Sequence, residues 1–151
     1  MGVISPQSVC QIALVVSDIE KAAKNYAALF GVPVPAFFQV PPPEIARTVY
    51  EGKPTSTRAT LCVFDLGQVV LELTQADDEP SSWKQFEQEH GDGVHHIGFQ
   101  VKDREAVMAY FRSLGITERH YGEYPGGNYT FMNTERDFGV LFNIKYEEGK
   151  K

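Results

Sequence analysis

Two adjacent histidines, His95 and His96, are the residues of this chain best suited by type and position to bind a ligand. They follow a glycine-rich turn and open a short apolar run within the stretch Gly91–Asp103. Successive side chains of a strand point to opposite faces, which gives two predicted sets. One face carries His96, Gly98 and Gln100, and the other carries His95, Ile97 and Phe99. The first face suits a ligand-lined surface and the second suits packing under helices. His96 is therefore predicted to be the ligand, with His95 as its neighbour, provided that His96 has companions elsewhere in the chain.

An internal repeat predicts where those companions lie. The apolar run Val9–Val16 leads to Asp18, and the run after His96 leads to Asp103; each aspartate is suited to cap a helix. Apolar spacing predicts a helix over 19–30, closed by Gly31. The matched positions are Asp18 with Asp103, Glu20 with Glu105, Tyr26 with Phe111, Leu29 with Leu114, Gly31 with Gly115, and Gly67–Leu73 with Gly139–Ile144.

The rest of the chain reads mainly as strands. Residues 58–64 and 68–74 are predicted to form a hairpin, and strands are predicted near 117–121, 128–132 and 140–146. A strand at 34–40 would end at Pro41-Pro42-Pro43, followed by a short strand near 48–50 and a polar loop at 53–57. Ser81 or Ser82 is suited to cap a helix over 83–90. We therefore expect an α+β fold in one domain, 1–151. It would contain two βαβββ modules, about 8–75 and 93–146, joined by a linker helix within about 76–92.

The repeat singles out four polar residues that interrupt otherwise mostly apolar strands. The first strand of each half contributes Gln11 or His96, and the last strand of each half contributes Glu72 or Asn143. If the halves curl around a pseudo-twofold axis, these side chains converge. A carboxylate is rarely buried without a partner, which favours a ligand role for Glu72. All four offer oxygen or nitrogen lone pairs, so together they could hold a divalent metal ion with open positions for substrate or water. Polar lining of a cavity is an equal alternative for Gln11 and Asn143.

From Gln11 to Ile144 the sequence resembles the vicinal oxygen chelate superfamily, which includes glyoxalases, bleomycin resistance proteins and ring-cleaving dioxygenases. The similarity rests on Leu71-Glu72-Leu73 followed by Gln75, on Gly91–Phe99 and on Gly139-Val140-Leu141. The Gly-x-Gly-x-His-His-Ile stretch is most similar to the methylmalonyl-CoA epimerase branch. The resemblance implies a vicinal oxygen chelate fold and a divalent metal ion (Co, Ni, Zn, Mn or Mg) held at the positions of Gln11, Glu72, His96 and Asn143.

Two of these positions depart from the pattern of the family. Gln11 stands where a histidine is usual, although some glyoxalase I enzymes have glutamine there. Asn143 stands where the epimerases have a glutamate that serves as both ligand and base, and an amide cannot abstract a proton. Glu72 and Glu51 are then the carboxylates left as candidate catalytic bases; Glu51 lies in the loop where epimerases place a second base. Lys145 shares the strand face of Asn143 and could meet an anionic substrate.

The resemblance implies a metal-dependent isomerase that stabilises the enolate of an acyl thioester. A glyoxalase I-type lyase acting on a hemithioacetal is one alternative. A metal-free small-molecule binding protein of the same fold is another, and Asn143 is the residue that favours it.

Composition excludes several classes of partner. The net charge is −6, without a basic stripe, which argues against nucleic acid. No apolar run approaches the ~20 residues of a membrane span, and the N-terminal residues lack a signal-peptide pattern. Cys10 and Cys62 lie in apolar runs and are expected to be buried thiols of a reducing compartment. We expect a cytoplasmic homodimer that acts on a small molecule such as an acyl-CoA.

Overall fold

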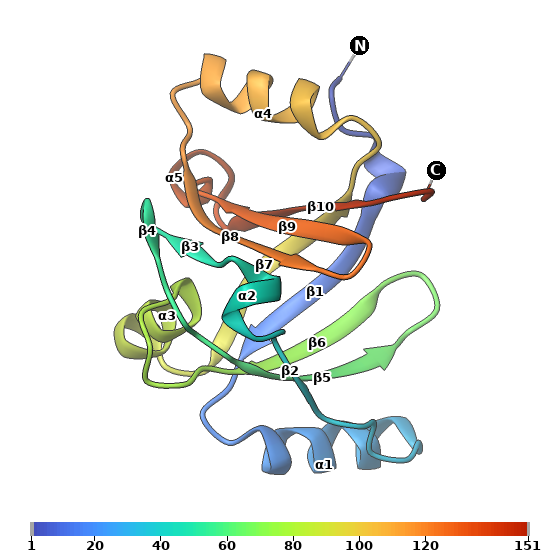
Figure 1. Ribbon diagram of the computed structural model, residues 1–151. Coiled ribbons are helices and arrows are strands. Elements are labelled where there is room, and N and C mark those ends of the chain that lie inside the picture. The colour runs from blue at the N-terminus through green and yellow to red at the C-terminus, as the bar shows by residue number, and fades with distance from the viewer. Residues whose placement is uncertain (1, 151) are drawn as a thin grey trace.

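In the computed structural model, which describes residues 2–150, ten strands form a single curled, mixed sheet (Figure 1). Its strand order is β2-β5-β6-β1-β7-β10-β9-β8-β3-β4. The strands are β1 (Val9–Val15), β2 (Phe38–Gln39), β3 (Val49–Tyr50), β4 (Lys53–Pro54), β5 (Thr60–Asp65), β6 (Val70–Gln75), β7 (Gly93–Gln100), β8 (Glu118–Tyr124), β9 (Gly127–Met132) and β10 (Leu141–Glu147). The helices are η1 (Pro6–Ser8), α1 (Ile19–Phe30), α2 (Pro43–Ala46), α3 (Ser82–His90), α4 (Arg104–Ser113) and α5 (Glu135–Phe138).

The two predicted halves meet at the centre of this sheet, where β1 and β7 run antiparallel. On one side β6 lies parallel to β1, and on the other β10 lies parallel to β7. The order β6-β1-β7-β10 is therefore symmetric about the β1·β7 pair, as an internal repeat requires. The α+β prediction is confirmed, with both halves contributing to one continuous sheet.

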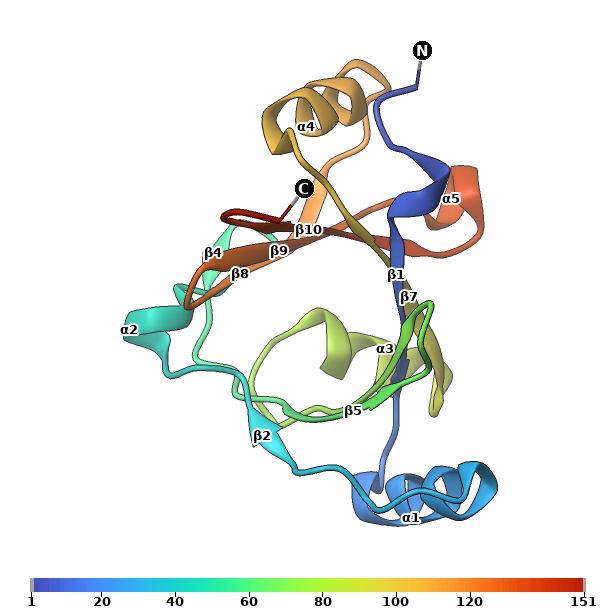
Figure 2. The same ribbon diagram turned by 90° about the vertical axis from the view of Figure 1, so that its right-hand side faces the viewer.

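The two long helices of the repeat begin where the sequence predicts. The carboxylate of Asp18 accepts a hydrogen bond from the Lys21 N–H (3.0 Å), and that of Asp103 accepts one from the Ala106 N–H (2.9 Å). These contacts satisfy backbone donors that lack a partner within the helix. The first helix ends at Gly31, which has a φ of 65°. Figure 2 shows α1 and α4 at opposite ends of the molecule, outside the curled sheet.

The segment between α1 and β5 differs from its prediction. Only Phe38–Gln39 of the expected strand at 34–40 forms β2, and the proline run leads into the short helix α2 with Pro43 at its first turn. Proline is tolerated there because the first N–H of a helix has no partner within it. The expected polar loop at 53–57 begins with β4, which pairs with β3. Residues 43–54, called the crossing arm below, leave the first half of the chain and bring β3 against β8 of the second half.

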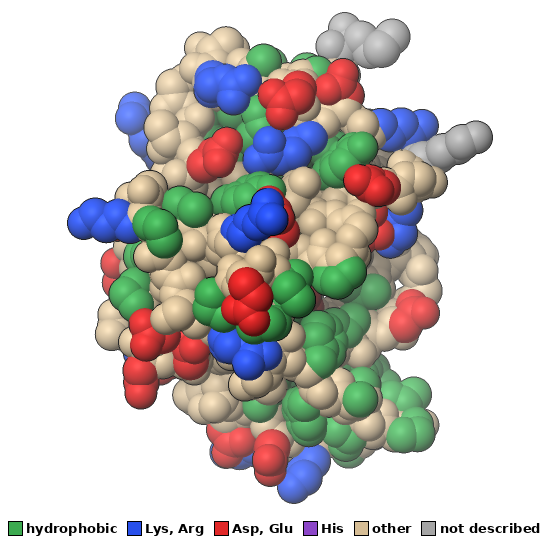
Figure 3. All heavy atoms as spheres, in the orientation of Figure 1, with side chains coloured by type: hydrophobic (Ala, Val, Ile, Leu, Met, Phe, Trp, Pro, Cys, Tyr) green, Lys and Arg blue, Asp and Glu red, His purple; other side chains and the backbone are tan. Residues whose placement is uncertain are grey.

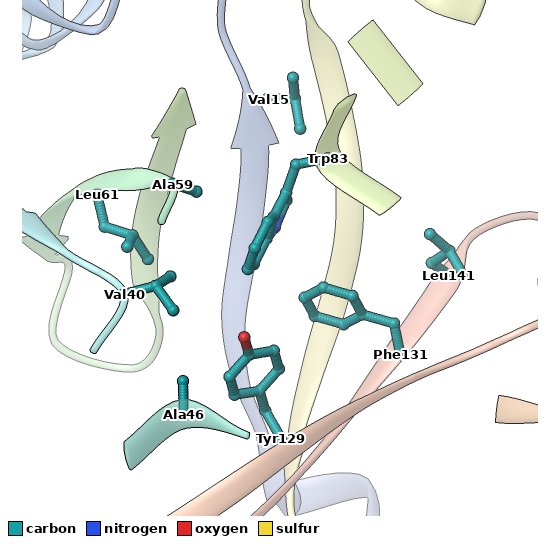
Figure 4. Packing of buried hydrophobic residues seen from close by; sticks show 9 residues of the cluster. All are labelled: Val15, Val40, Ala46, Ala59, Leu61, Trp83, Tyr129, Phe131 and Leu141. Atoms are coloured by element: carbon teal, nitrogen blue, oxygen red, sulfur yellow. The ribbon is translucent and has the colours of Figure 1, made fainter. Parts of the chain in front are cut away.

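The linker helix α3 is capped by Ser81, whose hydroxyl accepts a hydrogen bond from the Lys84 N–H (3.0 Å). This helix places Trp83 in an aromatic core within the curl of the sheet. In Figure 4 the rings of Trp83, Tyr129 and Phe131 point toward one another, between strands of both halves. The Trp83 and Phe131 ring centroids are 5.6 Å apart in an edge-to-face arrangement, which is a favourable geometry for aromatic pairs.

One face of the molecule carries charges of both signs. Acidic and basic side chains are interspersed on the face seen in Figure 3. Within residues 2–150 no helix is both long enough and apolar enough to cross a membrane. Both cysteines are free thiols; Cys62 is buried as predicted, whereas Cys10 is only partly buried.

Candidate active site

The strand register places the four polar residues in two adjacent rows across the central strands. In one row Gly98 of β7 lies between Gln11 of β1 and Asn143 of β10. In the next row, Ala13 of β1 pairs with Glu72 on one side and with His96 on the other. The middle residue of each row is small, so the longer side chains can lean over it toward one another. A Cβ added at Gly98 would lie only 2.7 Å from Gln11 Oε1 and 2.8 Å from Gln11 Cβ.

A β-bulge changes the predicted role of His95. Ala13 pairs with His96 and Leu14 pairs with Val94, which leaves His95 unpaired between them. Such an extra residue bends its strand and redirects side chains. Both histidines are consequently buried, with exposed fractions of 2% for His95 and 1% for His96, and their Nδ1 atoms are 2.8 Å apart. His95 is thus a direct partner of the His96 ring as well as its neighbour in sequence.

Hydrogen bonds join the four residues into one network centred on the Gln11 amide. Gln11 Nε2 donates to Glu72 Oε2 over 2.7 Å. Gln11 Oε1 lies 3.0 Å from His96 Nε2 and accepts a hydrogen bond from Asn143 Nδ2 over 3.1 Å. Glu72 Oε1 also accepts a hydrogen bond from the Thr74 hydroxyl, over 3.3 Å. The Gln11 side chain therefore bridges Glu72 and His96.

Three of these residues, Gln11, Glu72 and Asn143, line a cavity of about 490 Å³ within the curl of the sheet. Its walls are mainly apolar and include the aromatic residues Phe38, Trp83, Tyr124, Tyr129 and Phe131. Lys145 and Glu147 of β10 also line it. A largely apolar cavity with a few convergent polar groups is the usual form of a small-molecule site.

Burial controls the electrostatics of the network. It raises the pKa of Glu72, an effect partly offset by the Lys145 ammonium and by hydrogen bonds from Thr74 and Gln11. Burial also holds the pKa of His96 well below its ordinary value and lowers that of His95 to about 3. Both imidazoles are therefore neutral near pH 7, because desolvation disfavours the charged form.

The chemistry of the four side chains fits a divalent metal ion. They offer one carboxylate, one neutral imidazole and two amide oxygens, all of which serve as ligands for divalent cations. Asn143 Oδ1 is buried without a hydrogen-bond partner, which leaves an oxygen lone pair unused. Within the described part of the chain, however, no three His, Cys, Asp or Glu side chains gather in a way that could hold an ion. Any bound ion would therefore depend on the amides of Gln11 and Asn143.

The structure does not bring Glu51 to this site. Its side chain is exposed and absent from the cavity lining, while its N–H donates to the Arg119 carbonyl oxygen over 2.8 Å at the end of the β3·β8 pairing. The crossing arm carries Glu51 to the second half of the sheet. Glu147 is a cavity carboxylate that sequence reasoning missed.

Other residues at or behind the site also escaped the sequence analysis. Ser82 lies with its Oγ 3.3 Å from His95 Nε2, and its N–H donates to His120 Nδ1 over 3.3 Å. Tyr129 and Phe131 are two positions apart in β9, so both side chains lie on the same face of the strand. This spacing was the only signal in the sequence that both face inward. No sequence motif around these serine, tyrosine and histidine residues distinguishes them from ordinary buried residues.

Comparisons with known proteins agree with this architecture. A family model described as the Glyoxalase/Bleomycin resistance protein/Dioxygenase superfamily matches residues 10–131. No curated protein matches the chain significantly.

Several solved structures share the fold. A variant of methylmalonyl-CoA epimerase from Streptomyces coelicolor, in complex with 2-nitronate-propionyl-CoA, is 21% identical with a TM-score of 0.64; the match covers 94% of this chain and 98% of that one. The epimerase of Mycobacterium tuberculosis is 18% identical, with a TM-score of 0.65 and coverages of 97% and 92%. A hypothetical protein from Bacillus halodurans is 17% identical, with a TM-score of 0.67 and coverages of 95% and 96%. At these identities the likeness is one of fold.

Proposed function

Because this chain belongs to the Glyoxalase/Bleomycin resistance protein/Dioxygenase superfamily, we propose that it is a metal-dependent isomerase that stabilises the enolate of an acyl thioester. The observation that supports this most directly is the network of Gln11, Glu72, His96 and Asn143 beside an apolar cavity of about 490 Å³. One epimerase with which the chain shares its fold was solved in complex with 2-nitronate-propionyl-CoA, which suggests the acyl-CoA class of substrate.

In this proposal Glu72 is the base that removes the proton next to the substrate carbonyl. Burial raises the pKa of Glu72, which favours a base, whereas coordination to an ion would lower it, so Glu72 removes the proton only while its carboxylate is free of the ion. The apolar walls limit the water that would compete for the proton. Lys145 lines the same cavity and attracts an anionic substrate group. A divalent ion held by Gln11, Glu72, His96 and Asn143 would polarise the carbonyl and stabilise the enolate charge.

Epimerisation also needs a group that returns the proton from the opposite face, and the cavity offers a poor one. The Asn143 amide cannot exchange a proton in this way. Burial acts to raise the pKa of Glu147, but hydrogen bonds from Lys150 and Tyr124 outweigh it and hold this pKa below its ordinary value. We therefore propose that proton removal is faster than inversion, so that the protein exchanges the substrate proton more readily than it epimerises.

The test is exchange of the α-proton of methylmalonyl-CoA in heavy water, measured by mass spectrometry with Co²⁺-loaded protein. Exchange that requires Co²⁺, and that disappears in a Glu72→Gln variant that still binds Co²⁺, supports the proposal. A parallel assay with the hemithioacetal of methylglyoxal and glutathione tests the lyase alternative. Exchange that persists in Glu72→Gln contradicts the assigned base.

One observation favours a second candidate, a metal-free small-molecule binding protein. The polar groups of Gln11 are satisfied by Glu72, His96 and Asn143, and the described residues contain no cluster of three or more typical metal-binding side chains. Metal analysis of the purified protein, before and after incubation with Co²⁺, separates the two candidates. Protein that retains no Co²⁺ but binds acyl thioesters favours the second.

We also propose, from the family resemblance, that the protein is a cytoplasmic homodimer. Light scattering of the purified chain measures its mass in solution, and a value near the 16.9 kDa of one chain contradicts the dimer.

A further inference from the structure

The bulge in β7 produces an unusual contact between the two histidine rings. His95 Nδ1 and His96 Nδ1 are 2.8 Å apart, a hydrogen-bond distance between two nitrogens of the same kind. A neutral imidazole has one N–H donor and one acceptor nitrogen. At this distance one Nδ1 must carry a hydrogen and the other must accept it, because two bare nitrogens or two N–H groups would repel each other. The ring that donates at this contact has a bare Nε2, and the ring that accepts has an Nε2–H, if each ring carries one hydrogen.

Two arrangements of hydrogens satisfy the contact. In the first, the Ser82 hydroxyl donates to His95 Nε2, His95 Nδ1–H donates to His96 Nδ1, and His96 Nε2–H points at Gln11 Oε1. In the second, His96 Nδ1–H donates to His95 Nδ1 and His95 Nε2–H donates to the Ser82 hydroxyl oxygen. His96 Nε2 then presents a lone pair to the other site residues. A serine hydroxyl serves both forms because it can donate or accept.

The contacts of His96 Nε2 favour the first arrangement in the metal-free protein. Its shortest polar contact is Gln11 Oε1 at 3.0 Å, which is an acceptor, whereas the donor Asn143 Nδ2 lies at 3.5 Å. The Gln11 amide is held in this orientation because its Nε2 donates to Glu72 over 2.7 Å. In the second arrangement the lone pairs of His96 Nε2 and Gln11 Oε1 would face each other at 3.0 Å. Such a contact is favourable only when a cation lies between the two atoms and binds both.

We infer that His95 and the Ser82 hydroxyl are positioning residues that set the tautomer of His96, and that a divalent cation binds only the second arrangement. This inference rests on the metal-binding part of the proposed function. Conversion conserves the number of protons. The hydrogen between the rings passes from His95 Nδ1 to His96 Nδ1. The proton on His96 Nε2 is released to water, and His95 Nε2 takes up one proton from water. The Ser82 hydroxyl turns from donor to acceptor.

The direct test is ¹⁵N–¹H NMR of the imidazole rings in the full chain, with and without Zn²⁺. The metal-free protein is expected to show His96 protonated on Nε2 and His95 on Nδ1. Addition of Zn²⁺ is expected to move these hydrogens to His96 Nδ1 and His95 Nε2. A metal-free protein with His96 protonated on Nδ1, or rings that do not change on addition of Zn²⁺, would overturn the inference.

Variants test the same point through Zn²⁺ affinity, measured by calorimetry. His95→Phe removes the acceptor for His96 Nδ1–H and is expected to weaken Zn²⁺ binding about 10- to 100-fold, as loss of such supporting partners typically does. Ser82→Ala removes only the hydroxyl that contacts His95 Nε2, and it is expected to weaken Zn²⁺ binding less than His95→Phe does. His120→Phe is the matched control, because His120 is equally buried but meets the Ser82 N–H and not its hydroxyl.

The outcomes separate this inference from the isomerase proposal. Tautomer exchange on addition of Zn²⁺ without α-proton exchange on any acyl thioester contradicts the isomerase and supports the positioning role. Folded His95→Phe and Ser82→Ala proteins that bind Zn²⁺ as tightly as the wild type overturn the positioning role, whatever reaction is found.

Discussion

Replacing His120 by phenylalanine should make the protein less stable at neutral pH and less sensitive to acid. His120 is fully buried, and its ring centroid is 4.5 Å from that of Trp83 and 5.0 Å from that of Phe131. Its Nδ1 accepts a hydrogen bond from the Ser82 N–H, which phenylalanine cannot provide. An unsatisfied buried N–H costs about 1–3 kcal/mol, so the variant should be destabilised by about that amount at pH 7.

The sign of this difference should change in acid. Burial lowers the pKa of His120 in the folded protein to about 3, whereas an unfolded histidine titrates near 6.5. Below pH 6.5 the unfolded chain therefore binds a proton that the folded chain does not, and stability falls as the pH falls toward 3. Each pH unit in this window costs the wild type about 1.4 kcal/mol for this group, or about 2 kcal/mol between pH 6.5 and 5. The two stability curves are expected to cross near pH 5.

Urea unfolding between pH 5 and 8, followed by the fluorescence of the single tryptophan, Trp83, measures this difference. Carboxylates titrate in both proteins and largely cancel in the difference. The charges of His95 and His96 are coupled to that of His120, so the difference curve reports the titration of His120 together with this coupling. A difference in unfolding free energy that stays constant from pH 5 to 7 would show that His120 is not held neutral by burial.

Three other substitutions test the site and the fold. Gly98→Ala places a Cβ within 2.8 Å of Gln11. It should destabilise the protein by about 1–3 kcal/mol and reduce Co²⁺ binding. Unaltered Co²⁺ binding would show that Gln11 is not a ligand. Asn143→Glu supplies a carboxylate in place of an amide, which should tighten Co²⁺ binding and raise the rate of α-proton exchange. If exchange is fast in the wild type and its rate is unaffected by the substitution, then Glu72 is not the base. Asp103→Ala removes the cap of α4 at the Ala106 N–H and should cost about 1 kcal/mol in urea unfolding, without altering Co²⁺ binding.

Local patterns predicted much of the fold. The caps at Asp18 and Asp103 and the glycine that ends the first helix depend on neighbouring residues, and all three are confirmed. The repeat also singled out Gln11, Glu72, His96 and Asn143, which the structure brings into one network. Their role as metal ligands stays a prediction.

The features that escaped prediction depend on distant strands. The bulge that turns His95 inward exists only relative to β1, since it is a mismatch in the pairing of two strands. The placement of Glu51 depends on β3 pairing with β8, a partner about 70 positions further along the chain. Nothing in the sequence near these residues signals either pairing.

The crossing arm has a consequence for how the chain can be divided. The sequence repeat suggests a duplicated unit, but β3 and β4 of the first half complete the sheet edge formed by β8 of the second. A fragment containing only the second half would expose the backbone N–H and C=O groups of that edge, which are prone to pair with another chain.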